Sequence, residues 1–175
     1  MDLKEGILTR RSVRFFDKSR PVTEADINEI LTMAMYAPSA LNTQPWEFVV
    51  VKDKEVAKRI ASVHPYYQFV ADAPASILVC SNVNKEAVKD FWTVDAALAA
   101  QNIMLGCHAL GMESCWCSIY PSEDREASFS ELFDLPPHIR PLTLLVMGYP
   151  TKEPFQPHER FDPAKIHYNR WTSAA

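Results

Sequence analysis

The feature that most restricts the fold of this chain is one long apolar segment, residues 94–110, VDAALAAQNIMLGCHAL. The segment reads as a helix, and Gly111 follows it as a residue that commonly ends helices. Apolar side chains fall on nearly every face, and its alanines permit close contact with neighbouring helices. A helix that is apolar all round is buried on all sides. In a chain of 175 residues we expect a subunit interface to provide part of that cover.

The rest of the chain alternates short apolar runs with amphipathic segments. Their apolar and β-branched residues predict buried strands at 46–53, 75–82, 113–120 and 141–149. Further helices are predicted at 2–11, at 24–37 after an N-cap at Thr23, at 54–62 after Asp53, and at 123–135 after Ser122. This order indicates an α/β or α+β protein with a central sheet, and no repeat or internal boundary divides it.

Charge and hydropathy exclude several classes of protein. A formal net charge of −4 argues against general nucleic-acid binding, which needs a basic face across the fold. No apolar run approaches the roughly 20 residues that span a bilayer. The N-terminus, MDLKEGILTRR, lacks the layout of a signal peptide because acidic residues interrupt it. We therefore expect a cytoplasmic protein.

The four cysteines, Cys80, Cys107, Cys115 and Cys117, are predicted to be buried, reduced thiols. On a strand, Cys115 and Cys117 would share a face with Cα atoms about 6.6–6.8 Å apart, which is a poor distance for a disulfide. The chain contains no C-x-x-C pair for zinc, and we expect no metal site.

A cationic cluster lies near the N-terminus, where TRRSVRFFD places Arg10, Arg11 and Arg14 around Ser12. The end of a helix would explain the first two arginines through the macrodipole, but not Arg14. The whole chain has four glycines and contains neither G-x-x-x-x-G-K nor G-x-G-x-x-G. A bound phosphate would therefore be held by side chains, and arginine offers two donors in a fixed geometry.

A second polar cluster, APSALNTQPWEF, occupies residues 37–48. Turn propensity explains its proline, serine and asparagine residues, but not Gln44 and Trp46. Uncharged amides and hydroxyls suit the edge of a neutral heteroaromatic ring, such as a flavin or a pyrimidine.

Together these segments resemble the FMN-dependent nitroreductase family in its short form. RRSVRFFD, APSALNTQPWEFVVV, DAALAAQNIMLGCHALGMESCW, GYP and ER…HYNRW occur in the family's order over almost the whole chain. The resemblance implies an α+β, three-layer fold with a central, mostly antiparallel sheet flanked by helices, in a domain-swapped homodimer. It also implies one FMN-binding domain, residues 1–175, whose arm at 151–175 embraces the partner. Two FMN molecules would lie at the dimer interface.

The resemblance also assigns roles to individual residues. Arg10, Ser12 and Arg160 would hold the FMN phosphate end, and Arg14 would reach the pyrimidine edge of the flavin. Part of the 38–44 loop would come from the partner subunit, and the backbone around Trp116 would face the ring near its reactive nitrogen. The expected FMN-binding residues are Arg10, Arg11, Ser12, Arg14, Pro38, Ser39, Leu41, Asn42, Gln44, Trp116, Cys117, Ser118 and Arg160.

Some positions depart from the family pattern. His158 stands where many members have a basic residue, so we expect phosphate binding that is weaker or pH-dependent. The segment 61–95 is short, which implies that the helices covering the pocket in longer members are missing. Gln68 is aligned with a ribityl contact only weakly. Candidates for the pocket walls are Tyr66, Tyr67, Phe91 and Trp92.

The implied activity is a ping-pong, two-electron reduction of nitroaromatic, quinone or other electron-poor acceptors by NAD(P)H through FMN. Glu113 and Asp95 read as a strand end and a helix start, so no general base is assigned. Discrimination between NADH and NADPH stays open, because Arg59 and Arg125 cannot be placed from the sequence. The alternatives are a flavin storage protein, a dehalogenase or flavin-fragmenting relative, and a phosphate-binding module without flavin.

Overall fold

The computed structural model describes residues 1–154 and 159–171. Its α-helices are α1 (Leu3–Thr9), α2 (Glu24–Met35), α3 (Lys54–Val63), α4 (Trp92–Ala109) and α5 (Glu123–Leu132). Its strands are β1 (Trp46–Val51), β2 (Ala75–Asn82), β3 (Glu113–Ser118) and β4 (Ile139–Gly148). Short 3-10 turns are η1 (Ala40–Asn42), η2 (Pro65–Asp72), η3 (Val83–Lys85) and η4 (Pro163–Lys165). His158 lies outside the described residues.

The predicted helix caps are confirmed. Thr23 and Asp26 form a reciprocal capping box, with Asp26 N donating to Thr23 Oγ1 at 3.1 Å and Thr23 N to Asp26 Oδ2 at 2.9 Å. Asp53 accepts from the first turn of α3, and Ser122 accepts from that of α5. Gly111, after α4, has a φ of +74°, which glycine adopts without steric cost.

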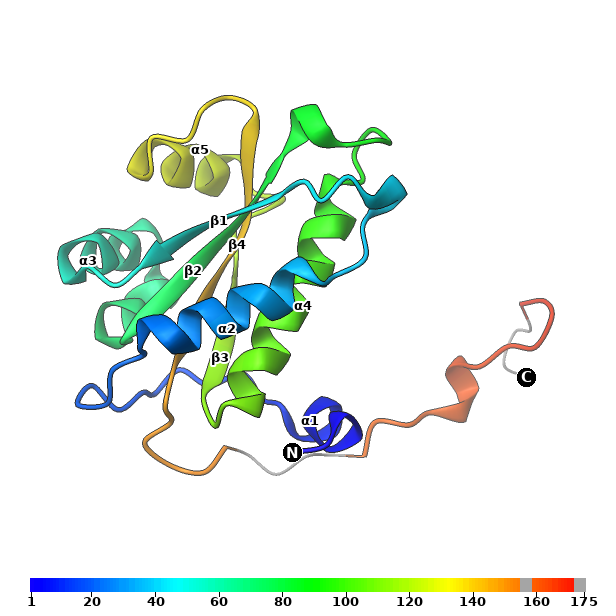
Figure 1. Cartoon of the computed structure of the whole chain (residues 1–175), viewed down its shortest axis with the longest axis horizontal. Coiled ribbons are helices and arrows are strands. Elements are labelled where there is room, and N and C mark those ends of the chain that lie inside the picture. The colour runs from blue at the N-terminus through cyan, green and yellow to red at the C-terminus, as the bar shows by residue number, and fades with distance from the viewer. Residues whose placement is uncertain (155–158, 172–175) are drawn as a thin grey trace.

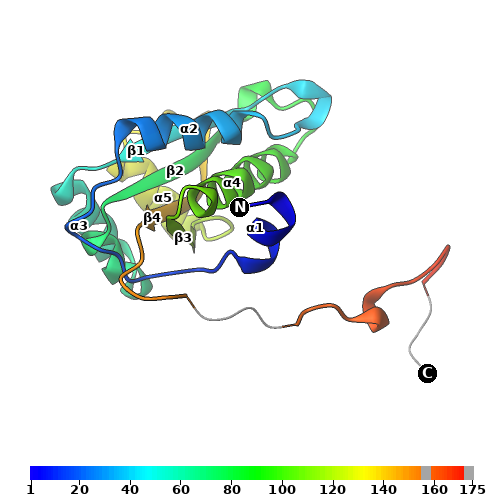
Figure 2. The same cartoon turned by 60° about the horizontal axis from the view of Figure 1, so that its bottom comes forward.

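The four strands form one sheet in the order β1-β2-β4-β3, and every neighbouring pair is antiparallel. This confirms the expected central antiparallel sheet. Helices α2 and α4 cover one face, and α3 and α5 lie on the other side (Figures 1 and 2). The chain therefore has three layers.

Each face of the sheet has its own hydrophobic core. Ile77, Val79, Leu145 and Met147 pack with residues of α2 and α4. The alternate residues, among them Leu78, Cys80, Leu144 and Val146, pack with residues of α3, η2 and α5. Because successive side chains of a strand point to opposite faces, both faces are buried only if every residue is apolar or small. This explains the continuous apolar runs of β2 and β4.

Helix α4 is not buried on all sides by its own chain, as expected for a helix that a second surface covers in part. Nine of its residues are buried, but Val94 is 48% exposed and Leu98 39% exposed. Leu105, one helical repeat further along the same stripe, is half-buried. One apolar stripe of α4 is thus left uncovered within a single chain.

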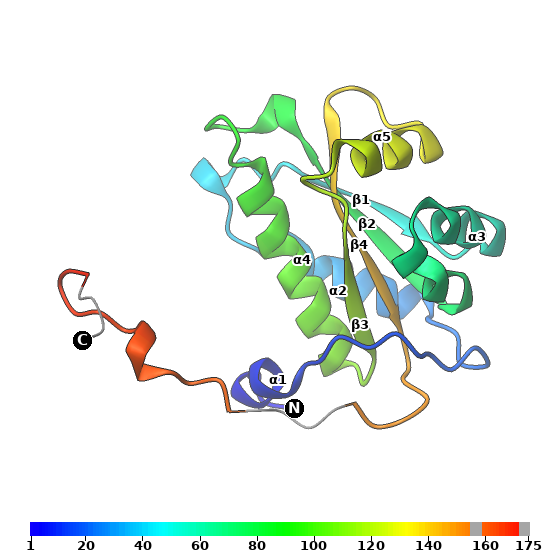
Figure 3. The same cartoon turned by 180° about the vertical axis from the view of Figure 1, so that it is seen from behind.

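The described part of the C-terminal arm, residues 159–171, extends away from the body of the protein and is seen clear of the sheet in every view (Figures 1 and 3). It carries large apolar side chains into solvent, with Phe161 72%, Tyr168 81% and Trp171 79% exposed. These large apolar side chains are thus left uncovered within one chain.

None of the helices in the described ranges combines the length and apolar composition needed to cross a bilayer. The four cysteines are free and buried. Within residues 1–154 and 159–171, no group of three or more His, Cys, Asp or Glu side chains is arranged to hold a metal ion.

Candidate functional site

The segment after α1 runs beside β3, which is an edge strand of the sheet. Ser12 and Ser114 form a parallel β-bridge, and Val13 N donates to Ser114 O at 3.1 Å. Val13 is buried, at 1% exposure, whereas Ser12 and Arg14 on either side of it are exposed. The alternation of an extended segment therefore anchors Val13 in the core and presents Ser12 and Arg14 on the surface.

The arginines preceding this segment carry uncompensated positive charge. Helix α1 ends at Thr9, so Arg10 is its C-cap and Arg11 lies beyond it. Arg11 Nη1 donates to Leu8 O at 3.0 Å and to Arg10 O at 2.6 Å. Arg10 Nη1 and Arg11 Nη2 are buried and have no hydrogen-bond partner in the described part of the chain. Buried donors without partners are costly, and an anion would satisfy them.

Arg160, from the arm, lies near this cluster. Burial lowers the pKa of Arg10, and the charges of Arg11 and Arg160 lower it further, whereas Glu113 raises it. Among the described residues, Arg10, Arg11 and Arg160 form no ion pair. Two adjacent guanidinium groups and a third from a distant part of the sequence thus repel one another, which favours a multiply charged anion such as a phosphate.

A cavity of about 400 Å³ lies next to this cluster, along the outer edge of β3. Four expected ring-contacting residues line it: Arg14, Trp116, Cys117 and Ser118. The Arg14 guanidinium lies over the Phe69 ring, with Cζ 5.9 Å from its centroid. The remaining lining residues are His64, Tyr66, Tyr67, Phe69, Cys115 and Arg125. The cavity combines aromatic walls with cationic side chains, which suits a planar ligand that carries or takes up negative charge.

Hydrogen bonds fix the shape of this cavity. Tyr67, buried to 3% exposure, donates its hydroxyl hydrogen to Ser118 O at 2.6 Å. Trp116 Nε1 donates to Ser118 Oγ at 3.0 Å, and Thr143 Oγ1 donates to Cys117 O at 2.9 Å. The wall formed by β3 is therefore held before any ligand binds.

Two of the four thiols belong to the cavity. A hydrogen bond to Cys117 lowers the pKa of Cys115, with smaller contributions from Arg14 and Arg10, while burial opposes them. The same hydrogen bond, together with burial, raises the pKa of Cys117. By contrast, burial raises the pKa of Cys80 and Cys107 to about 12. The cavity thus distinguishes Cys115 from the purely structural thiols.

The 38–44 loop does not line this cavity within one chain. It has positive φ values at Leu41 (49°), Asn42 (57°) and Gln44 (48°), and Leu41 is 84% exposed. The loop is ordered by Asp95 Oδ1, which accepts from Ala40 N at 3.0 Å. Three non-glycine residues in the left-handed region are costly and typically mark functional loops.

Hydrogen bonds within that loop also hold its other residues. Gln44 N donates to Ser39 Oγ, and Gln44 Nε2 donates to Asn42 Oδ1, both at 3.0 Å. Pro38 is exposed beside them. The structure therefore separates the expected site residues into three groups: those that line the cavity, those on this loop, and the arginine cluster with Ser12.

A buried polar network, which the sequence did not reveal, lies behind Arg10. His108 Nδ1 is 2.8 Å from Glu113 Oε1, and His108 Nε2 is 2.8 Å from Thr9 Oγ1. Thr9 Oγ1 donates to Glu5 O at 2.7 Å, so it accepts from His108. The network joins the end of α1 to α4 and to the start of β3.

Glu113 is therefore more than a strand end. Only 4% of the residue is exposed, and burial raises its pKa, while His108 and the Arg11 backbone lower it. A carboxylate beginning an otherwise buried strand, five residues after a histidine, was the available signal. The network fixes the backbone from which Arg10 and Arg11 project.

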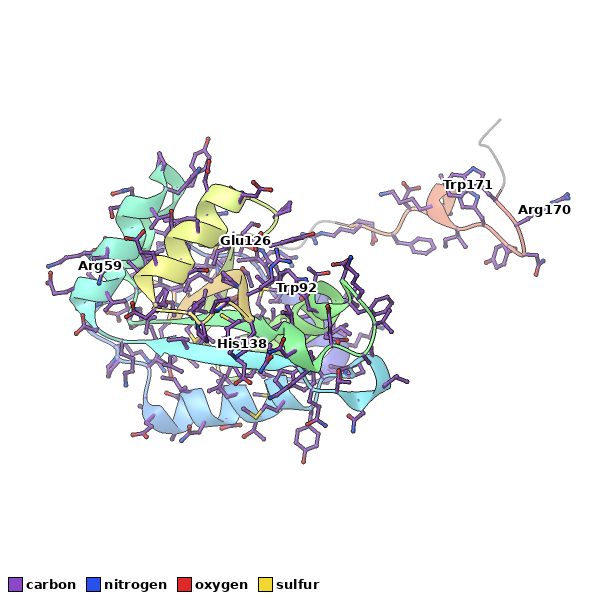
Figure 4. The ribbon with its side chains drawn as sticks, turned by 90° about the horizontal axis from the view of Figure 1, so that it is seen from above. Arg59, Trp92, Glu126, His138, Arg170 and Trp171 are labelled. Carbon is purple, nitrogen blue, oxygen red and sulfur yellow. The ribbon has the colours of Figure 1, made fainter. Side chains whose placement is uncertain are left out.

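The structure also shows where several further residues from the sequence analysis lie. Trp92 is 2% exposed and belongs to the core, whereas Tyr66 and Tyr67 line the cavity. Arg59 is exposed on α3, on the opposite side of the molecule from the labelled arm residues (Figure 4). Gln68 Nε2 donates to Ala61 O at 2.8 Å. Arg125, whose position could not be inferred from the sequence, lines the cavity.

A larger cavity of about 670 Å³ lies among α1, α2 and α4. It is lined by Met1, Asp2, Leu3, Gly6, Thr32, Met33, Tyr36, Asn102, Leu105, Gly106 and Ala109. No guanidinium or imidazole group is among its described lining residues, so it offers an apolar surface and little that could hold an anion.

Comparison with known proteins identifies a family and related sequences. The model of the "Nitroreductase family" matches residues 7–63 and 61–149. A "Putative NADH dehydrogenase/NAD(P)H nitroreductase" of Methanothermobacter thermautotrophicus is 42% identical over 171 residues, covering 98% of this chain and 88% of that protein.

Solved structures show the same fold. A "Putative NADH dehydrogenase/NAD(P)H nitroreductase" from Parabacteroides distasonis has a TM-score of 0.90 at 32% identity, covering 96% of this chain and 98% of that chain. An "FMN-dependent Nitroreductase" from Clostridium difficile has a TM-score of 0.88 at 26% identity, covering 97% of this chain and all of that one (100%).

Proposed function

This chain belongs to the nitroreductase family, and from that premise we propose that it reduces nitroaromatic, quinone or other electron-poor acceptors by two electrons. It is an NAD(P)H-dependent oxidoreductase, and FMN is its cofactor. The observation that carries the proposal is the pair of buried donors without partners, Arg10 Nη1 and Arg11 Nη2, next to the cationic cavity along β3.

The residues present fit FMN. Arg10, Arg11, Ser12 and Arg160 would hold the phosphate, because their unneutralised charge and free donors match a dianion. The ring would lie in the cavity between aromatic side chains and the edge of β3. FMN supplies the capacity to take up a hydride and to pass electrons on, and the protein supplies placement and charge.

Arg14 would stabilise negative charge at the pyrimidine edge of the ring. It lines the cavity and has no ion pair among the described residues, so its guanidinium is free to donate. A charge-assisted hydrogen bond contributes about 1.5–3 kcal/mol. Arg14 would therefore favour the reduced form of the cofactor more than its binding.

The 38–44 loop and the arm would complete the site from a second copy of the chain. Three exposed apolar surfaces support a homodimer: the α4 stripe of Val94 and Leu98, the α2–η1 region with Tyr36 and Leu41, and the arm aromatics. Exposed apolar surface of this extent typically marks an interface. The loop would then contribute Pro38, Ser39, Leu41, Asn42 and Gln44 to the partner's cavity.

If both substrates use the cationic cavity along β3, the order of reaction would be ping-pong. NAD(P)H and the acceptor would use it in turn, since it is too small to hold both beside a flavin ring (about 400 Å³). Its aromatic walls would then select acceptors by shape and redox potential.

The test is anaerobic titration of the purified, FMN-loaded protein with NADH and with NADPH. We expect the flavin absorbance to bleach and to return when a nitroaromatic or a quinone is added, with parallel double-reciprocal plots in steady state. A protein that stays yellow under NADH and NADPH would be a flavin store, and this result would refute the proposed activity.

A further inference from the structure

Arg125 is a second cation in the ring cavity, and the function proposed above gives it no role. It lies in the first turn of α5 and is half-buried. It forms no ion pair with any residue in 1–154 or 159–171. Its acidic neighbour Glu126 is paired with Arg140 at 2.7 Å, and neither Glu123 nor Asp124 lines the cavity.

The position of Arg125 is defined by Tyr67. The Arg125 guanidinium is close enough to the Tyr67 hydroxyl to lower its pKa, although burial, the larger influence, raises it. That hydroxyl donates to Ser118 O, and the Tyr67 ring packs edge-on against Phe129 of α5, with centroids 6.1 Å apart. Arg125 therefore lies at the Ser118 end of β3.

Arg14 reaches the same wall from the segment after α1, not from α5. It influences the thiols of Cys115 and Cys117, and its guanidinium lies over Phe69. The parallel bridge between Ser12 and Ser114 places Arg14 in register with Trp116, two residues, or about 7 Å at the usual rise, before Ser118. The two guanidinium groups thus face different parts of whatever fills the cavity.

The cavity holds no charge that could neutralise them. His64 is the third titratable basic side chain in its lining, and among the described lining residues none is Asp or Glu. The other walls are aromatic, so a planar ring fits between them. If Arg14 serves the flavin edge, Arg125 is left for the molecule that exchanges electrons with it.

Resting on the proposed function, we propose that Arg125 determines substrate specificity by binding the negative group of a planar aromatic acceptor, such as a carboxylate. The 2′-phosphate of NADPH is the other anion that could reach the enzyme. It sits on the adenosine part, far from the nicotinamide that reacts, so with the nicotinamide in the cavity the 2′-phosphate would lie well away from the reacting ring. An aromatic acceptor carries its charged group directly on the ring, so the ring could lie between the aromatic walls while the charged group reaches the guanidinium.

The test compares 4-nitrobenzoate with 4-nitrobenzamide, which differ in charge but hardly in shape. The FMN-loaded wild type, Arg125→Gln, Arg125→Lys and the control Arg59→Gln are measured with both acceptors. We expect Arg125→Gln to lower the ratio of kcat/KM for the anion to that for the amide about tenfold, mainly through KM, because a charge-assisted hydrogen bond is lost. Arg125→Lys should recover part of the ratio, and Arg59→Gln should leave it at the wild-type value.

A binding measurement accompanies the kinetics. 4-Nitrobenzoate is titrated into the oxidised enzyme while the flavin spectrum is followed, and its Kd should rise about tenfold in Arg125→Gln. Equal loss for both acceptors would overturn the proposal, as would a changed NADPH to NADH ratio with an unchanged acceptor ratio. If NAD(P)H failed to reduce the wild-type flavin at all, the proposed function itself would fall, so the two failures are distinguishable.

Discussion

Two cavities of this protein differ in size and in chemistry, and the larger of the two is the more apolar. The larger one, about 670 Å³, lies among α1, α2 and α4 and is lined mainly by apolar side chains. The smaller one, about 400 Å³, runs along β3 and contains Arg14, Arg125 and His64. Arginine side chains line the smaller one but not the larger one. We therefore base the proposed site on unneutralised charge and not on volume.

The difference has a physical origin. Covering an apolar cavity lowers the free energy, because apolar surface is removed from water. A second protein surface is therefore enough to fill it. A cluster of guanidinium groups is destabilising until an anion neutralises it, and so it requires a specific ligand. We expect changes at the smaller cavity to alter cofactor chemistry and changes at the larger one to alter association between chains.

Removing the phosphate-binding charges should have the largest effect. The double variant Arg10→Gln/Arg11→Gln loses at least two charge-assisted hydrogen bonds, about 3 kcal/mol or more in total, and should weaken FMN binding by roughly a hundredfold. Fluorescence titration with FMN and with riboflavin, which has no phosphate, measures this. Riboflavin binding should change far less. A comparable loss of FMN in Leu105→Ala, at the larger cavity, would contradict the comparison.

Arg14→Ala should come next. Loss of its guanidinium removes about 1.5–3 kcal/mol from the reduced state, which for a two-electron couple lowers the flavin potential by about 30–65 mV. Turnover should slow more than FMN binding weakens. Spectroelectrochemical titration gives the potential, and an unchanged value would exclude this role for Arg14.

Charge placed on the apolar side should affect association instead. Tyr36→Asp and Leu98→Asp put a carboxylate on surfaces that would be buried between two copies, and we expect self-association to weaken about tenfold or more. Analytical ultracentrifugation measures the dimer dissociation constant. Val50→Asp, on β1 and also exposed, is the matched control. If the control weakens association equally, this surface is not the interface.

The smallest effect concerns pH and Glu113. Because its pKa is raised in the folded state, chiefly by burial, the folded protein holds that proton more tightly than the unfolded chain does. The stability this contributes is fully present below the unfolded pKa, about 4.3, and is lost as pH rises through the folded pKa. Glu113→Gln should therefore gain in stability relative to the wild type over that rise.

Urea unfolding at a series of pH values checks this. Glu24→Gln, an exposed carboxylate in the first turn of α2, is the control and should follow the wild type. A stability difference between Glu113→Gln and wild type that does not vary with pH would show that Glu113 does not titrate as its burial implies.

Much of the fold was readable because it depends on short-range features. The caps at Thr23, Asp53 and Ser122 act within three residues, and the continuous apolar runs of β2 and β4 report strands buried on both faces. The end of α1 was predicted less well. It was placed at Arg11, but Arg10 is the cap, and a frayed helix end carries no strong sequence signal.

The site was only partly readable. Arg14, Trp116, Cys117 and Ser118 were expected together, and they line one cavity. Tyr66 and Tyr67 were expected as wall residues and also line it. Arg125 and the His108–Glu113 pair gave no comparable signal, because each acquires its role from a neighbour on another element.

By itself, the sequence determined which segments form helices and strands, where they are capped, and that positive charge gathers near the N-terminus. Those properties depend on residues a few positions apart, whose interactions hold in almost any context. Only the tertiary structure decided which charges remain unneutralised, since Arg10, Arg125 and Arg160 come close to their neighbours through folding alone. Electrostatic interactions depend on distance in space and on burial, and neither is contained in the order of the residues.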